Sequence, residues 1–337
     1  MLSQLKTAVN PRVGYYLPPS ALPPSAKKMS SVRKPLDATA VSIMVLLCLT
    51  WGLSQVATKT ASEGISPVTQ AAIRSAVAAV LLFGWTRLRG IPLFAHDGTL
   101  VPGVLAGLLF GAEFVFIFLG LAWTDAARMV VFIYLAPCIT AVGLAWFVPG
   151  ERLNARQWIG VLTAFGGLVL AFADAFSSAR GTLPGDVFGL IGGALWAATT
   201  VVVRATKLSS ISAGKTLFYQ LAVSAVMLAV LALVLREPGV TKLTPLVMLS
   251  LFYQCVIVAF ASFLAWFWLL TRYLASRLSV FTFLTPLFGV AAGVILLDET
   301  VTTPFLGAAL LVGAGIYLVN SPGRSEVNVP VPVQKKA

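Results

Sequence analysis

Residues 126–137 read AARMVVFIYLAP, and residues 275–286 read ASRLSVFTFLTP. Six of the twelve positions are identical at a constant offset of 149 residues, including the arginine at the third position and the proline at the last. Both segments lie in long apolar runs, and both runs lead to acids, Glu151 in the first and Asp298-Glu299 in the second. An aligned arginine and an aligned proline inside apolar sequence rarely arise by chance, so we interpret the chain as a duplication.

The composition is that of a polytopic membrane protein. Of the 337 residues, 58% are hydrophobic and 11% are charged, whereas a soluble domain carries about 25% charged residues. The net charge of +12 would suggest a nucleic-acid partner in a soluble protein, but in a membrane protein Lys and Arg accumulate in cytoplasmic loops. We therefore expect no nucleic-acid partner. Cys48, Cys138 and Cys255 all lie within apolar runs, so neither a metal cluster nor a cofactor is predicted.

The two ends of the chain are predicted to be polar cytoplasmic tails, residues 1–37 and 321–337. Residues 1–35 contain six Lys and Arg residues, six prolines and no acid, a composition that favours disorder because it cannot bury a core. Two alternatives stay open for the first tail. It could be an organellar transit peptide, although its proline density disfavours the amphipathic helix of such peptides, or the true start could be Met29.

Ten apolar segments are long enough to cross a bilayer, which takes about 20 residues for a hydrocarbon core of about 30 Å. Five spans belong to a first repeat, residues 38–175, and five to a second, residues 183–320. The loops between them are short. The spans fall near residues 40–58, 67–86, 100–120, 127–148, 156–173, 185–203, 214–235, 246–270, 278–297 and 304–320.

Charge sets the expected orientation. With the N-terminus inside, 18 Lys and Arg residues fall on inner segments and five on outer loops, which the positive-inside rule favours strongly. We expect a multi-pass protein of the plasma membrane, the bacterial inner membrane, with both termini cytoplasmic. Because five spans is an odd number, Arg128 begins span 4 from outside and Arg277 begins span 9 from inside. The predicted fold is all-α, with ten transmembrane helices as two inverted five-helix repeats.

Two further sets of residues support the duplication. One face of span 1 carries a tryptophan and two polar residues spaced four apart, and span 6 carries a similar set at an offset of 145. These residues are Trp51, Gln55 and Lys59 in span 1, and Trp196, Thr200 and Arg204 in span 6. In spans 5 and 10, Gly160 and Gly166 align with Gly307 and Gly313, most simply because small residues let helices approach closely.

Together these features resemble the EamA family of the drug/metabolite transporter (DMT) superfamily. The resemblance covers about residues 38–320 and depends on the order and spacing of residues rather than on one motif. In the first half it rests on Trp51-Gly52, Pro67, Arg74, Pro137, Gly150-Glu151-Arg152-Leu153, Gly160 and Gly166-Gly167, and in the second on Gly185, Trp196, Pro286, Glu299 and Gly307. It implies an inner-membrane secondary transporter with ten helices. Members commonly export amino acids, related metabolites or drugs, but the family provides no portable binding motif.

Two charged residues lie well inside spans, the acid Glu113 and the cation Arg74. A charge at that depth costs at least about 2.5–3.5 kcal/mol, so such residues usually face a cavity or a partner. Glu113 is a candidate proton site or counter-charge for an amine, and alternatively a protonated or paired structural acid. Arg74 is a candidate for binding a substrate carboxylate. Its alternatives are snorkelling to the outer interface and structural pairing with Glu113.

The remaining cavity candidates are aromatic, amide and hydroxyl side chains on faces predicted to point inward. For each of them a helix–helix contact is the alternative. They are Trp51, Gln55, Gln70, Tyr134, Trp196, Thr200, Tyr219 and Gln220, with Tyr253 and Gln254 as further possibilities. By contrast, we expect Trp266, Trp268 and Tyr273, near the inner end of span 8, to anchor the helix at the interface.

Pro137 and Pro286 occupy equivalent mid-span positions. Each lacks a backbone donor and clashes with the carbonyl four residues earlier, at Ile133 or Thr282. We predict hinges at these two prolines, with inert kinks as the alternative. The charges at span ends, Arg128, Arg277, Glu151 and Glu299, are expected to be solvated, with a gating pair as the alternative.

We therefore predict a secondary active transporter that exports a small metabolite, amino acid or drug-like solute by alternating access. Its partners would be the lipid bilayer and a small-molecule substrate, with a proton as candidate coupling ion, in a monomer or a homodimer. The competing classes are an integral membrane enzyme and a channel-like pore. The sequence contains neither an H-E-x-x-H motif nor a phosphate-binding G-x-x-x-x-G-K-[ST] loop, so we predict that the chain is not an enzyme.

Overall fold

The computed structural model describes residues 36–124, 126–176, 183–297 and 303–321. Nearly all of these residues are helical, and their helices match the ten predicted spans. Seven spans are single helices: α1 (Ala38–Ala61), α2 (Pro67–Leu88), α3 (Leu100–Leu121), α6 (Ala155–Ala171), α7 (Leu183–Ala205), α8 (Ala213–Val234) and α13 (Thr303–Asn320). The prediction of an all-α protein with ten transmembrane helices is confirmed. The expected tails and the acids Asp298 and Glu299 lie outside the described residues.

The other three spans are interrupted. Span 4 consists of α4 (Ala126–Ile133) and α5 (Ala136–Phe147), and span 9 consists of α11 (Ala275–Phe281) and α12 (Leu284–Leu297). Span 8 consists of α9 (Pro245–Phe252), the π-helical segment η4 (Tyr253–Ser262) and α10 (Phe263–Arg272). Two short 3₁₀ turns, η2 (Ala173–Phe176) and η3 (Lys207–Ser210), follow α6 and α7. Within the described chain, eight spans are long and apolar enough to cross a membrane, and α6 and α13 are shorter.

The breaks in spans 4 and 9 lie just before the two aligned prolines. Pro137 falls in the first turn of α5, where a missing amide proton costs nothing. The Thr282 carbonyl accepts a hydrogen bond from the Thr285 amide at 3.0 Å, so a tightened turn replaces the bond that Pro286 cannot make. The Ile133 carbonyl instead faces Gly193 of α7, where a Cβ atom would lie 2.7 Å from it. Gly193 therefore gives the broken segment room to pack against α7.

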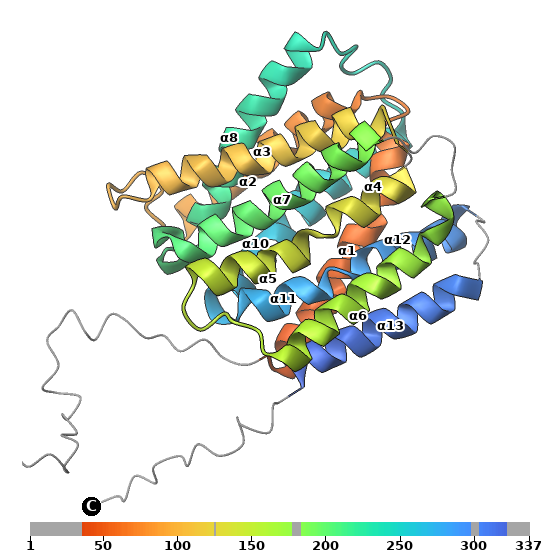
Figure 1. Ribbon diagram of the computed structural model, residues 1–337. Helices are drawn as coiled ribbons and strands as arrows, with labels where there is room; N and C mark the ends of the chain where they lie inside the picture. The colour runs from red at the N-terminus through yellow and green to blue at the C-terminus, as the bar shows by residue number, and fades with distance from the viewer. Residues whose placement is uncertain (1–35, 125, 177–182, 298–302, 322–337) are drawn as a thin grey trace, which may run out of the picture. The chain divides into compact units, whose positions relative to one another are not determined.

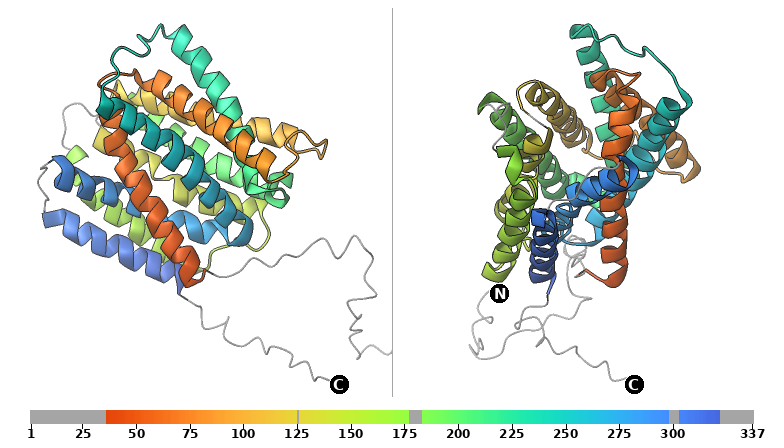
Figure 2. Two further views of the ribbon diagram at one scale, coloured as in Figure 1. Left: turned by 180° about the vertical axis from the view of Figure 1, so that it is seen from behind. Right: turned by 90° about the vertical axis from the view of Figure 1, so that its right-hand side faces the viewer.

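Helix contacts between the two halves occur in exchanged pairs. α1 packs on α12 as α7 packs on α5, and α3 packs on α7 and α8 as span 8 packs on α1 and α2. The α2–α8 and α6–α13 pairs are their own counterparts; α6 and α13 run side by side in Figures 1 and 2. Such exchange is what a two-fold relation between repeats produces. With five spans in each repeat, that relation inverts one repeat relative to the other.

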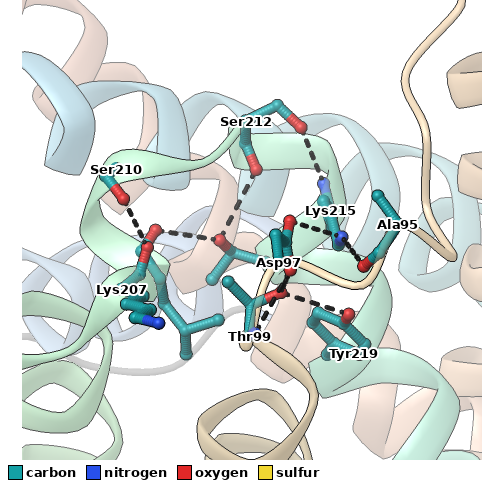
Figure 3. Close-up of polar contacts among 10 residues, drawn as sticks. Ala95, Asp97, Thr99, Lys207, Ser210, Ser212, Lys215 and Tyr219 are labelled. Atoms are coloured by element: carbon teal, nitrogen blue, oxygen red, sulfur yellow. Dashed lines mark hydrogen bonds and ion pairs between the residues drawn. The ribbon is translucent and has the colours of Figure 1, made fainter.

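A polar cluster ties the loop before α3 to the beginning of α8 (Figure 3). Asp97 Oδ2 lies 2.8 Å from Lys215 Nζ, and Asp97 Oδ1 accepts a hydrogen bond from Thr99 Oγ1 at 2.5 Å. The hydroxyls of Thr99 and Tyr219 are 3.3 Å apart, and Lys215 also donates to the Ala95 carbonyl. The hydrogen bonds from Lys215 and Thr99 lower the pKa of Asp97 to about 2. This cluster joins the first repeat to the second.

A second acid makes the corresponding tie at the other end of the α2–α8 pair. Glu237, in the loop after α8, accepts hydrogen bonds from the backbone amides of Val68 at 3.1 Å and Thr69 at 2.8 Å. A carboxylate at this place satisfies the free amides of the first turn of α2. Partial burial would raise the pKa of Glu237, but its hydrogen bonds outweigh that effect and lower the pKa. Both ends of the α2–α8 pair are thus held by the opposite repeat.

Candidate functional site

A cavity of ≈ 350 Å³ lies between the two repeats. Helices α1, α2, α3, α4, α7, α8, α10 and α12 all contribute to its wall, together with η4 and the break between α4 and α5. Because the inverted repeats meet around it, neither half forms the cavity alone. The lining residues are Trp51, Ser54, Gln55, Arg74, Phe110, Glu113, Phe114, Ile117, Val130, Ile133, Tyr134, Trp196, Thr199, Thr200, Val203, Gln220, Val258, Phe263, Trp266, Phe267, Leu270 and Thr285.

Most of the residues singled out in the sequence come together in this lining. They are Trp51, Gln55, Arg74, Glu113, Tyr134, Trp196, Thr200 and Gln220. Gln70 and Tyr219 do not line the cavity. Gln70 Nε2 donates to the Thr58 carbonyl at 3.3 Å, and Tyr219 contacts Thr99 in the loop cluster. Both are used in contacts between segments, which is the alternative that the sequence left open.

Tyr253 and Gln254 also serve packing between helices, since both tie η4 to α1. The Tyr253 hydroxyl donates to the Thr50 carbonyl at 3.0 Å, and Gln254 Nε2 donates to the Ala57 carbonyl at 3.3 Å. Neither belongs to the cavity lining.

The two intramembrane charges face the cavity with unused hydrogen-bonding capacity. Arg74 and Glu113 are 9% and 8% exposed, and the Arg74 guanidinium lies 4.7 Å from the centre of the Phe114 ring. Arg74 Nε and Nη2 and Glu113 Oε2 have no hydrogen-bond partner among the described residues. A buried polar atom left in this state costs free energy unless water or a ligand satisfies it. The pair therefore offers a donor and an acceptor to a bound polar solute.

Aromatic rings form most of the apolar wall. Trp51 meets Trp266 edge-on at a centroid distance of 5.9 Å, and Tyr134 meets Trp196 edge-on at 5.4 Å. The Trp51 indole N–H donates to Ser262 Oγ at 2.8 Å, which fixes the orientation of that ring. The expectation that Trp266 anchors span 8 at the interface is wrong, because its side chain is 9% exposed and lines the cavity.

Several lining residues had no sequence signal that set them apart. Ser54, Thr199 and Thr285 are small hydroxyl residues in apolar helices, a setting in which such residues commonly bond to their own backbone. Thr199 Oγ1 indeed donates to the Leu195 carbonyl at 2.9 Å. Thr285, by contrast, lines the cavity from the α12 side of the break in span 9, beside Tyr134 of the first repeat.

The sequence predicts that the charges at the span ends are solvated, but not all of them are. Glu151 is 1% exposed and paired with Arg204, so that expectation is wrong for this acid. Arg128 and Asp186 pair at 2.6 Å, with side chains that are 16% and 13% exposed. Arg277 is buried as well, at 8%.

Comparison with known proteins assigns this architecture to a family. The model of the EamA-like transporter family matches residues 38–173 and 183–321, one copy on each repeat. The chain belongs to the EamA-like transporter family. It is therefore a multi-pass membrane transporter, embedded in a lipid bilayer and acting on a small-molecule solute.

Two relatives illustrate how far the likeness of this EamA-like transporter extends. It is 24% identical over 277 residues to an uncharacterized transporter, YoaV, from Bacillus subtilis (strain 168), covering 82% of this chain and 94% of the relative. It is 25% identical over 286 residues to the "Probable amino-acid metabolite efflux pump" of Escherichia coli (strain K12), covering 82% and 93%. A protein of known crystal structure shares the fold at a TM-score of 0.71, with 20% identity over 84% of this chain and 96% of that one.

Proposed function

We propose that this EamA-like transporter is a secondary active carrier that exports a small amphipathic metabolite, such as an amino acid or a related compound, by alternating access. One observation carries the proposal: the cavity between the inverted repeats presents unpartnered atoms of Arg74 and Glu113 beside an aromatic wall. Inverted repeats around a shared site are the arrangement in which one half can rock against the other.

The chemistry of the cavity suits a solute with a charged head and an apolar body. A guanidinium binds a carboxylate through two parallel donors, and Glu113 can accept from an ammonium group. The rings of Trp51, Tyr134 and Trp196 would cover the apolar part. A volume of ≈ 350 Å³ is near the lower end of ligand pockets, which run from about 300 to 1,000 Å³. The Escherichia coli relative is named for amino-acid metabolites, which agrees with this class.

The proposal can be tested with purified protein in liposomes loaded with candidate amino acids and related zwitterions. The variant Arg74→Gln removes the carboxylate-binding group, so we expect the KM for carboxylate-bearing solutes to rise at least tenfold. A hydrogen bond to a charged group contributes about 1.5–3 kcal/mol, which corresponds to that range or more. The control is Arg87→Gln on the exposed end of the same helix, whose kinetics should match the wild type. An unchanged KM in Arg74→Gln would remove the carboxylate site.

Coupling to protons through Glu113 is an extension of the same proposal. If Glu113 exchanges a proton during the cycle, Glu113→Gln should abolish uphill transport driven by a pH gradient while exchange of solute across the membrane continues. Transport by Glu113→Gln with normal rate and unchanged pH dependence would refute this coupling.

The same preparation separates the two rival classes. A carrier gives a flux that saturates with solute concentration and responds to a gradient, because each cycle moves one bound solute. A channel-like pore would give flux that does not saturate, and an enzyme would hydrolyse or transfer a group on its substrate. Either result would overturn the carrier.

A further inference from the structure

Glu151 is the most fully bonded charged side chain at either end of the described helices. It follows α5, in the first repeat, yet the partners of its carboxylate belong to the second. Its carboxylate accepts two hydrogen bonds from the guanidinium of Arg204 at the end of α7, one of them from Nε at 3.0 Å. It also accepts from the Ala275 amide at 3.1 Å, and from the amide and hydroxyl of Ser276 at 3.0 and 2.7 Å. One acid thus joins α5, α7 and α11.

This cluster, Glu151 with Arg204 and Ser276, closes one end of the cavity. Val203 and Leu270 line the cavity at that end and are 4% and 3% exposed. Arg204 follows Val203 directly in α7, and its Nη1 donates to the Leu270 carbonyl at 3.3 Å. The guanidinium that Glu151 binds therefore also holds Val203 and Leu270, the apolar residues at this end of the cavity, in place.

The two broken spans differ in burial, although the repeats are related. In Ala275–Ala292 of α11–α12, 78% of residues are buried, whereas only 39% are buried in an apolar 18-residue stretch of α4–α5. All seven residues of α11 are buried, whereas Met129 and Val131 alone are buried in α4. The cavity residue Gln55, in α1, is exposed. The structure is thus sealed at the α11 end and looser at the α4 end.

We propose that Glu151 is a positioning residue that locks the transporter shut at the α11 end, and that its bonds to Ser276 and Arg204 must break before the cavity opens there. Because the two repeats are related by a two-fold exchange of helix contacts, opening at the α11 end would leave α11 as loosely packed as α4 is in this structure. The proposal rests on alternating access for its role in transport, but the lock itself is a property of the unloaded protein.

Hydrogen–deuterium exchange of the protein in lipid nanodiscs tests the lock without any solute. The wild type should protect the amides of α11 more than those of α4. In Glu151→Gln, which removes the charge but keeps the shape, α11 amides should exchange at least tenfold faster, because exchange follows local opening. Amides of the α2–α8 pair, which is not among the helices packed against α11 or α5, should be unaffected. Asp186→Asn, which breaks the Arg128 pair at the other end, is the matched control and should leave α11 protected.

The second readout is transport, where a lock moves turnover rather than binding. Glu151→Gln should lower the maximal rate at least tenfold with a KM within twofold of the wild type, and Glu151→Asp should restore part of the rate. If Glu151→Gln does not fold, Ser276→Ala removes one hydrogen bond and should speed α11 exchange to a smaller extent. Unchanged α11 exchange in the variants, or faster exchange spread over all helices, would overturn the lock. Selective α11 opening in the variants, together with no transport by the wild type, would leave the lock intact and overturn the carrier function.

Discussion

A carboxylate in this protein behaves according to the donors around it. Glu151 is buried among five donors from three residues. Asp97 is exposed beside a lysine, and Glu113 is buried with Oε2 unpartnered. The same chemical group therefore locks a helix, ties a loop or faces a cavity. We expect substitutions of these acids to have different kinds of effect, and not only effects of different size.

The exposed acid gives a prediction about pH. Folding lowers the pKa of Asp97 to about 2, below the value of about 3.9 in an unfolded chain. Its contribution to stability is therefore complete above about pH 4 and is lost as the pH falls through about 2. Asp97→Asn should lower the Tm by a few degrees at pH 5–7, and the gap to the wild type should close between pH 4 and pH 2.

Thermal unfolding in one detergent across that pH range checks this prediction. Glu63→Gln, at an exposed acid on another loop, serves as the control and should track the wild type throughout. A Tm gap for Asp97→Asn that stays constant down to pH 2 would contradict the ion pair as its source.

Residue roles could be predicted where the signal was chemical and local. A charge inside an apolar run, such as Arg74 or Glu113, must face a cavity or a partner, and both line the cavity. The partners of Glu151 could not be predicted, because its donors lie 53 to 125 residues away in the chain. Only the packing of two repeats brings them to one acid.

At the scale of helices, the α6–α13 pair depends on glycine at particular positions. A Cβ atom at Gly315 would lie 2.4 Å from the Gly160 carbonyl oxygen, whereas a Cβ at Gly313 would meet nothing within 4 Å. We expect Gly315→Ala to destabilise the protein by about 1–3 kcal/mol through overpacking. Gly313→Ala, two residues away on the same helix, should be neutral or stabilise by about 0.5–1 kcal/mol, as alanine does in helices.

The two alanine variants form a matched pair, since the chemical change and the helix are the same. In one detergent the unfolding midpoint of Gly315→Ala should fall, and that of Gly313→Ala should stay at the wild-type value or rise. Equal shifts would show that the α6–α13 contact is not as close as described. Of the aligned glycines, only Gly160 makes the close contact that sequence alignment suggested, and Gly166 meets no atom within 4 Å.

The broken spans give a prediction about turnover. Replacing Pro137 or Pro286 by alanine restores an amide donor and removes the clash that favours the break. We expect Pro137→Ala and Pro286→Ala to slow turnover several-fold with only a modest loss of solute binding, because a continuous helix bends less readily. The measurement is maximal rate against KM in liposomes.

Pro67→Ala is the control for both proline variants, because Pro67 lies in the first turn of α2 and interrupts no helix. Its turnover should equal that of the wild type. Unchanged turnover in both mid-span variants would remove the hinge role.

The existence of the helices and the two breaks could be predicted from the length of the apolar runs and the positions of the prolines. The π-helical segment η4 could not, since a shift to hydrogen bonds between residues i and i+5 leaves no periodic pattern in ten residues.

The exchanged helix contacts constrain the whole molecule. α1 on α12 and α7 on α5 are one contact made twice, and the doubled sequence predicted that relation from aligned residues alone. What it could not predict is that the two copies would be packed differently. If both ends of the cavity were sealed, no solute could reach it. An asymmetric state, such as one with a sealed α11 end, is therefore expected of any carrier built from two inverted repeats.

The inverted arrangement of the repeats predicts the location of two arginines at equivalent positions. Arg89 follows α2 and Arg236 follows α8, and both are exposed. If the repeats are inverted, these loops lie on opposite sides of the membrane, with Arg89 in the cytoplasm by the excess of positive charge on that side. In a chain whose Cys48, Cys138 and Cys255 are replaced by alanine, Arg236→Cys should react with an impermeant maleimide in intact cells. Arg89→Cys should react only in inverted vesicles, and labelling of both from one side would disprove the inverted arrangement on which the shared cavity depends.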